Sequence, residues 1–506
     1  MDSSRTTNSK RNIIWSYLEY FITIIFSFVS RTVIVYYLGA NYLGLSSLFT
    51  SILQVLNVAE LGFSVAITYN MYKPIADNNI DTVCALLNFY KKVYQIIGII
   101  VFVAGIIIMP FVPALIKGEW PQNLNIFIIY FIFLVNTSVS YFLFSYKAAL
   151  LNALQRLDLT KIAYCTVNVL QYALQLIAIV FFENYYIFAI LMVLGTASKN
   201  IYNAYISKKK FPQYECRGTL SKEVKKSIAN KVRGLLICNV SAITYTTFDS
   251  IILSAMIGLS SVAIYNNYLI VFNGLTSVIV IVRMGMQASI GNSVASESVE
   301  KNYKDIFKWQ FQFSAIAMFC TICLVCVYQP FMKWWMGEEM LLKQIDSVLL
   351  SLLFFISTIQ HAYYLYLNAA GLWLEMRWVY IFSAVLNIIM NFTLCRLMGT
   401  TGIIVATLVA NIISGLIWQP IIVFRSYFRK PIGCYFAKQL YYLLLTVIVG
   451  CGCLFLCSLV DIDGLVGIFL RLGICSCSVF MVGYIIFRKN EAFISCLEIV
   501  KRIISN

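Results

Sequence analysis

The chain has 506 residues, of which 60% are hydrophobic and only 12% charged, and its formal net charge at pH 7 is +16. This composition excludes a water-soluble fold, because so few polar residues could not cover the surface of a soluble protein of this size. It predicts an all-α, polytopic membrane protein. The basic residues lie between apolar runs, as in cytosolic loops of membrane proteins, so nucleic acid is not an expected partner.

In chain order, the first twelve residues, MDSSRTTNSKRN, are polar and basic, and the apolar run after them is too long for a cleaved signal peptide. We expect it to be retained as a signal anchor. Apolar runs of about 20 residues, long enough to cross a bilayer as a helix, then recur along the chain. They predict about fourteen spans: 13–37, 43–67, 90–113, 124–146, 161–182, 186–206, 233–257, 262–286, 307–329, 344–368, 377–397, 401–423, 438–460 and 464–487.

The orientation follows from the basic loops. An even number of spans places both termini on one side, and the heaviest basic loop, SKKKFPQYECRGTLSKEVKKSIANKVRG, follows the sixth span. The positive-inside rule therefore predicts cytosolic termini.

The chain also matches itself at a long interval. GANYLGL at 39–45 matches GLSSVAI at 258–264, and Val167–Leu170 matches Leu386–Ile389, both 219 residues apart; Asn152-Ala153 and Asn368-Ala369 are 216 apart. A repeated offset predicts two parallel six-helix lobes related by a pseudo-two-fold axis, a transporter architecture. The expected parts are an N-terminal lobe at 1–206, a basic cytosolic linker at 207–232, a C-terminal lobe at 233–430, two extra helices at 431–487 and an amphipathic cytosolic tail at 488–506.

Polar side chains form stripes on the first two expected helices of each lobe. Asn57 and Glu60 belong to the stripe of the second span, Asn239 to the seventh and Asn266 to the eighth. Such stripes line a pathway, although Ser, Thr and Asn also bind helices to one another.

Arg31 lies inside the first span, where an arginine costs roughly 2.5–3.5 kcal/mol on insertion scales. Three roles stay open for it: a phosphate ligand, one half of an outer-gate ion pair with Asp249, or a side chain that reaches the outer interface. Glu60 and Asp249 also suggest proton or sodium coupling.

The sequence contains no nucleotide-binding loop and no catalytic set around its single histidine, His361, so we expect a protein that is not an enzyme. The fifteen cysteines include several inside apolar runs and are interpreted as small reduced hydrophobic residues. No metal site and no cofactor are expected.

Several segments resemble the multidrug/oligosaccharidyl-lipid/polysaccharide (MOP) exporter superfamily, and within it the Wzx-like polysaccharide flippases. They are LGANYLGLSSLFTSILQVLNVAELGFSVAI at 38–67, YKAALLNALQRLDLTKI at 146–162, FDSIILSAMIGLSSVAIYNN at 248–267, LNAAGLWLEMRW at 367–378 and LNIIMNFTLCRLMGTTGIIVATLVANII at 386–413. They cover the first twelve expected spans in order.

The resemblance implies two lobes in a V around a cationic cavity. It implies transport of undecaprenyl-pyrophosphate-linked oligosaccharide from the cytosolic to the outer leaflet of the bacterial inner membrane, for O-antigen or capsule synthesis, with a polymerase and a chain-length regulator as partners. Motif position suggests Arg31, Lys147, Asp249, Tyr265 and Arg377 as pathway residues, and Arg283 joins this set. Asn70 and Met71 stand where family members often have an arginine.

Two alternatives stay open. A cation-coupled drug antiporter of the same superfamily would share the twelve spans, but the two extra spans and the basic, tyrosine-rich chain fit it less well. A membrane polysaccharide polymerase or ligase would need an acceptor platform outside the membrane, and the expected outer loops are short, the longest lying near GEWPQNLN and KWWMGEEMLLKQ.

Overall fold

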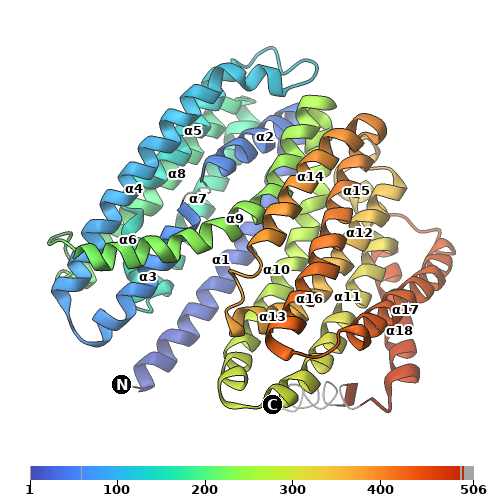
Figure 1. The fold of residues 1–506 in the computed structure, drawn as a ribbon. Helices are drawn as coiled ribbons and strands as arrows, with labels where there is room; N and C mark the ends of the chain where they lie inside the picture. The colour runs from blue at the N-terminus through green and yellow to red at the C-terminus, as the bar shows by residue number, and fades with distance from the viewer. Residues whose placement is uncertain (1, 58–59, 491–492, 495–506) are drawn as a thin grey trace. The chain divides into compact units, whose positions relative to one another are not determined.

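The computed structural model describes residues 2–57, 60–490 and 493–494, which form helices joined by short loops (Figure 1). Contacts divide the chain into two compact units, Met1–Ala263 and Ile264–Asn506. The first unit contains α1 (Asp2–Tyr37), α2 (Ala40–Leu56), α3 (Glu60–Ala76), α4 (Ile80–Ile108), η2 (Met109–Leu115), α5 (Ile126–Phe142), α6 (Ser145–Ala153), α7 (Leu157–Phe182), α8 (Tyr185–Lys210), α9 (Lys222–Met256) and the first residues of α10 (Leu259–Ser296).

The second unit contains the rest of α10, followed by α11 (Val299–Met336), η3 (Glu338–Met340), α12 (Gln344–Ile359), α13 (His361–Ala370), α14 (Arg377–Met398), α15 (Thr400–Asn411), η4 (Ile412–Trp418), α16 (Gln419–Val423), η5 (Phe424–Phe428), α17 (Gly433–Ser458) and α18 (Gly464–Phe487). The segments η4 and η5 are π-helical. The long helix α11 packs against α12, α17 and α18.

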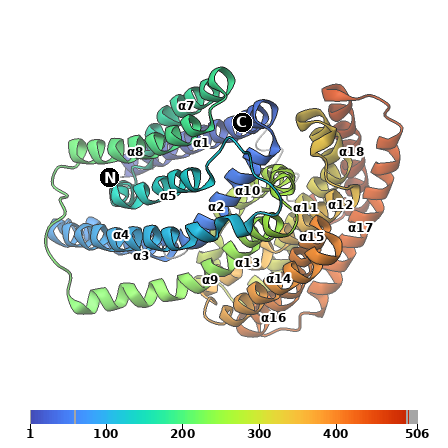
Figure 2. The same cartoon turned by 90° about the horizontal axis from the view of Figure 1, so that it is seen from above.

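Within the first unit, neighbouring helices pack in the order α1, α7, α8, α5, α4 and α3 (Figures 1 and 2). The Phe26 and Tyr172 rings stack between α1 and α7 with their centroids 4.9 Å apart. Helix α9 packs against α2 and α3, so contacts place it in the first unit, whereas the sequence repeat assigns residues 233–257 to the C-terminal lobe. The lobe limits expected from the sequence stay a prediction.

Polar residues begin several helices by accepting hydrogen bonds from free backbone N–H groups. Asn79 caps α4, Asn125 caps α5, Asn184 caps α8 and Ser298 caps α11. Asn79 and Ser298 are 219 residues apart, the offset found in the sequence.

The same offsets recur in the backbone. Gly39 and Gly258, which precede α2 and α10, both adopt positive φ, a conformation that favours glycine. Three further pairs have positive φ. Gly118 pairs with Gly337 at the 219-residue offset. Gln155 pairs with Gly371, and Glu183 with Gly399, at the 216-residue offset. These positions follow the offsets of the sequence match, and the two-lobe repeat itself stays a prediction.

Within the described residues, ten helices are long and apolar enough to cross a membrane, or eleven if the pair α5 and α6, bent by 47°, is one span. Of the fourteen expected spans, 43–67 is divided between two 17-residue helices, α2 and α3. The expected span 186–206 lies on α8, which ends in three lysines. The expected span 233–257 lies almost wholly on the 35-residue helix α9, of which Thr247–Met256 is apolar and has described side chains. An all-α multi-pass membrane protein is confirmed, with ten or eleven spans supported.

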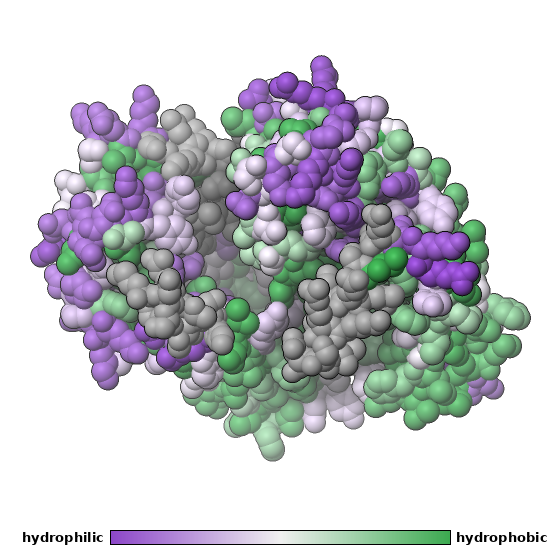
Figure 3. All heavy atoms as spheres, turned by 90° about the horizontal axis from the view of Figure 1, so that it is seen from below, coloured by the Kyte–Doolittle hydropathy of each residue, from purple (hydrophilic) through white to green (hydrophobic). Residues whose placement is uncertain are grey.

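The helix flanks carry large exposed apolar side chains, such as Phe181 at 75%, Ile448 at 69% and Leu397 at 79% exposure. Figure 3 shows one face of the molecule, on which hydrophilic side chains gather and hydrophobic surface lies beside them. Lipid accounts for such exposed apolar flanks. Residues 491–492 and 495–506 of the expected amphipathic tail lie outside the described part of the chain.

Candidate functional site

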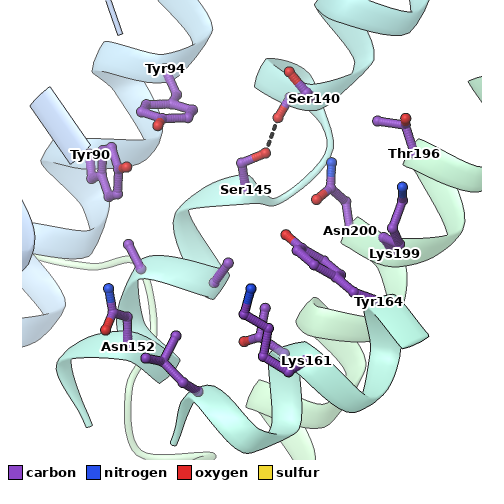
Figure 4. Close-up of a pocket in the computed structure, with 14 residues that line it drawn as sticks. Tyr90, Tyr94, Ser140, Ser145, Asn152, Lys161, Tyr164, Thr196, Lys199 and Asn200 are labelled. Carbon is purple, nitrogen blue, oxygen red and sulfur yellow. Dashed lines mark hydrogen bonds between the residues drawn. The ribbon is translucent and has the colours of Figure 1, made fainter. Parts of the chain in front are cut away.

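A polar cavity of about 460 Å³ lies inside the first unit. Figure 4 shows α4 on one side of it and α7 and α8 on the other, with α6 and the end of α5 between them. The lining residues are Tyr90, Tyr94, Ser140, Ser145, Ala148, Ala149, Asn152, Leu157, Thr160, Lys161, Tyr164, Thr196, Lys199 and Asn200.

Two lysines give the cavity its charge. The Lys161 ammonium of α7 lies 3.0 Å from the Glu19 carboxylate of α1. The Lys199 ammonium of α8 donates to Asn168 Oδ1 at 3.1 Å, a neutral partner. Both ammonium groups lie 5.9 Å from the centroid of the Tyr164 ring. One carboxylate thus balances two ammonium groups, which leaves the lining cationic and suited to an anion.

Aromatic rings and small polar groups complete the lining. Tyr90 and Tyr94 of α4 meet edge to face with centroids 4.4 Å apart. Thr160 is 5% exposed, and its hydroxyl oxygen has no hydrogen-bond partner among the described residues. A buried polar group without a partner costs about 1–3 kcal/mol, so this hydroxyl points to a ligand or a water in the cavity.

A buried carboxylate beside the cavity fixes the position of the start of α7. Asp158 of α7 accepts two hydrogen bonds from the Arg156 guanidinium, at 2.9 and 3.0 Å, and lies 3.3 Å from Arg11 of α1. Asn12 accepts from the Asp158 backbone N–H at 2.7 Å and donates to the Gln155 carbonyl at 3.0 Å. These contacts join α1 to the start of α7, two residues before Thr160, and so fix the helix that carries Lys161.

The pathway residues expected from the sequence divide between the two units. In the first unit, Asn57 accepts a hydrogen bond from the Tyr141 hydroxyl at 2.9 Å, and Lys147 donates to the Tyr214 carbonyl at 3.1 Å. Arg31 is half-buried on α1, and Asp249 on α9 is buried.

In the second unit, Tyr265 is buried and Asn266 is half-buried on α10. The Arg283 guanidinium lies 5.6 Å from the Tyr364 ring centroid, and that of the exposed Arg377 lies 5.7 Å from the Trp378 ring centroid. The side chains of Glu60 and Asn239 lie outside the described part of the structure. The pathway role of the whole set, including the Arg31 and Asp249 gate, stays a prediction.

The lysines and tyrosines of the cavity are absent from that expected set. Lys199 offered a signal, because it is a charge inside the apolar run 186–206. Lys161 lies in YKAALLNALQRLDLTKI, but only the tertiary structure brings it to the same tyrosine ring as Lys199.

Solved structures share this fold. The lipid II flippase MurJ, in an inward closed conformation, aligns with a TM-score of 0.67 at 12% identity, over 94% of this chain and 99% of that one. An inward-facing multidrug-resistance MATE transporter of the MOP superfamily aligns at 0.65 and 13% identity, over 80% and 95%. A MATE transporter from Vibrio cholerae aligns at 0.52 and 14% identity, over 85% and 100%.

The search of curated proteins found no match. A sequence model of the polysaccharide biosynthesis protein family matches residues 9–281, more than half of the chain. The resemblance stated from the sequence is thereby confirmed. The chain belongs to the polysaccharide biosynthesis protein family and is a multi-pass membrane protein.

Proposed function

We propose that this membrane protein is a flippase for undecaprenyl-pyrophosphate-linked oligosaccharide, which it carries from the cytosolic to the outer leaflet of the bacterial inner membrane. Its family membership and its fold likeness to a lipid II flippase over 94% of the chain support the proposal. The observation that carries it is the polar cavity of the first unit, because its lining matches a phosphorylated saccharide.

Each part of such a headgroup has a counterpart in the lining. Phosphate oxygens accept hydrogen bonds from ammonium groups such as those of Lys161 and Lys199. Sugar rings pack their C–H faces on aromatic side chains, and Tyr164 and Tyr94 offer such faces, while Asn200 and Thr160 are suited to hydroxyl groups. A volume of about 460 Å³ holds part of a headgroup and excludes the polyprenyl chain, which stays in lipid.

In this mechanism, two six-helix lobes expose the headgroup site to each side of the membrane in turn. Arg31 and Asp249 belong to the proposed pathway, with Arg31 as a phosphate ligand or as half of an outer gate. Proton or sodium coupling through Glu60 or Asp249 remains part of the proposal. A polymerase and a chain-length regulator would act on the flipped product.

The test is deletion of the gene followed by complementation. Lipid-linked repeat units should accumulate in the cytosolic leaflet of the deletion strain, and wild-type protein should restore surface polysaccharide. Purified protein in liposomes should move a labelled lipid-linked oligosaccharide to the opposite leaflet. Export of an organic cation with no movement of glycolipid would instead identify a drug antiporter, and chain elongation in vitro would identify a polymerase.

A further inference from the structure

Three cysteines distant in the sequence meet inside the second unit. Cys326 of α11, Cys457 of α17 and Cys475 of α18 are all buried, and their sulfur atoms all lie within 4.8 Å of one another. These three helices pack against one another. The cluster lies apart from the polar cavity, which is lined by first-unit residues.

Two further thiols border this cluster. Cys323 precedes Cys326 by about one turn of α11, and Cys453 precedes Cys457 by about one turn of α17. This spacing places Cys323 on the same face of α11 as Cys326, and Cys453 on the same face of α17 as Cys457.

We propose that the cluster of Cys326, Cys457 and Cys475 binds a thiophilic closed-shell cation of the zinc class. Zinc in structural sites takes four ligands at about 2.3 Å from sulfur, which places ligand sulfurs about 3.8 Å apart in a tetrahedron. The sulfur atoms of Cys326, Cys457 and Cys475 need only small side-chain rotations to reach that spacing. The three thiolates leave the fourth position of the tetrahedron to a water molecule.

The charge of the site can be balanced locally. Three thiols that bind one Zn²⁺ release three protons to solvent and leave a net charge of −1. Arg471 precedes Cys475 by about one turn of α18, and its guanidinium donates to the Val460 and Ile462 carbonyls at 2.7 and 3.1 Å. The Cys457 thiol donates to the Arg471 carbonyl at 3.9 Å. Arg471 is the one charged side chain of α18, and it lies about one turn from Cys475 in the sequence.

Such a site would join α17 and α18, which lie outside the internal repeat, to α11 of the repeat. The sequence holds a signal for it that the expectation of no metal site overlooked. Cys320, Cys323 and Cys326 recur every third residue, which places successive thiols near one another along one helix. The partners from α17 and α18 become visible only when the helices pack.

The test is titration of the reduced, metal-free, full-length protein in detergent with Cd²⁺, which gives ultraviolet sulfur-to-metal charge-transfer absorption. We expect a band that saturates at one equivalent. Cys475→Ser should lose it, whereas Cys477→Ser should keep it, because Cys477 lies on the same helix but is exposed. A wild-type protein without a saturable band, or two variants that behave alike, would overturn the proposal.

A second measurement needs no variant. Zn²⁺ added to the wild-type protein should protect Cys326, Cys457 and Cys475 from a membrane-permeant alkylating reagent, as measured by mass spectrometry of peptides, and should leave Cys477 reactive. Equal labelling with and without Zn²⁺ would contradict metal binding. A disulfide between two of the three cysteines, found in protein isolated without reductant, would show a covalent link in place of the metal and would overturn the proposal.

Discussion

At the scale of single residues, the polar cavity depends on an incomplete balance of charge. Lys161 has a carboxylate partner in Glu19, whereas Lys199 has the neutral amide of Asn168. Lys199 is therefore the cation with more to gain from a phosphate. An arginine in its place would keep the charge but change the geometry of the donors.

Lys199→Ala should lower flipping of a lipid-linked oligosaccharide about tenfold or more, because a hydrogen bond to a charged group contributes roughly 1.5–3 kcal/mol. Lys199→Arg should retain part of the rate. The measurement is the initial rate in proteoliposomes at subsaturating substrate. Lys209→Ala is the matched control, since Lys209 is exposed near the end of the same helix; equal rates for both alanine variants would exclude Lys199 from the substrate site.

Glu19→Gln should act in the opposite direction. Loss of this carboxylate leaves Lys161 without its 3.0 Å ion-pair partner and makes the cavity more positive. Binding of an anionic headgroup should therefore tighten, measured as a lower KM or as stronger binding of a soluble sugar diphosphate. Weaker binding in a correctly folded variant would show that the cavity does not hold an anion.

Asp158→Ala should lower the thermal stability of the purified protein, since it leaves the Arg156 guanidinium without its two hydrogen bonds. We expect a loss of about 1–3 kcal/mol. The control is Asp81→Ala, which removes an exposed pair with Arg217 and should cost at most about 1 kcal/mol. Thermal unfolding in detergent measures both, and similar losses would show that the Asp158 network adds little.

At the scale of elements, close helix contacts depend on glycines. A Cβ added to Gly402 at the start of α15 would overlap the backbone carbonyl of Leu394 in α14, and backbone atoms cannot rotate away as a side chain can. A Cβ added to Gly44 of α2 would likewise overlap the carbonyl of Leu259 at the start of α10. Gly44 belongs to the first copy of the internal repeat and Leu259 to the second.

Gly402→Ala should destabilise the second unit by about 1–3 kcal/mol, the usual cost of overpacking. Gly452→Ala on α17 is its control, because a Cβ there meets no heavy atom within 4 Å. The midpoint of thermal unfolding should fall for the first variant and stay level or rise for the second. A level midpoint for Gly402→Ala would show that α14 and α15 separate easily.

At the scale of the whole molecule, the basic residues between helices predict the orientation in the membrane. Lys208, Lys209 and Lys210 end α8, and the basic segment continues to the start of α9. The positive-inside rule predicts that this segment lies in the cytosol. A fluorescent protein fused to the C-terminus should therefore fluoresce, and an alkaline phosphatase fused there should be inactive; the reverse result would contradict cytosolic termini.

The sequence by itself determined the membrane class and the all-α fold, and it predicts the internal repeat. Each rests on local properties: the length of apolar runs, and glycines that recur where the chain must turn, such as Gly39 and Gly258. It also indicated the family, because the family motifs are short stretches of contiguous chain. The count of fourteen spans did not follow from apolar runs alone, since the run at 43–67 holds parts of two helices, α2 and α3.

Only the tertiary structure decided which polar residues share a site. Lys161 and Lys199 come from different helices and meet at Tyr164, and the three buried thiols come from three helices. Polar stripes show that a helix face avoids lipid but do not identify the face that it meets. That choice depends on side-chain packing between helices distant in the sequence, which is why the cavity and the cysteine cluster emerge only once the helices have packed.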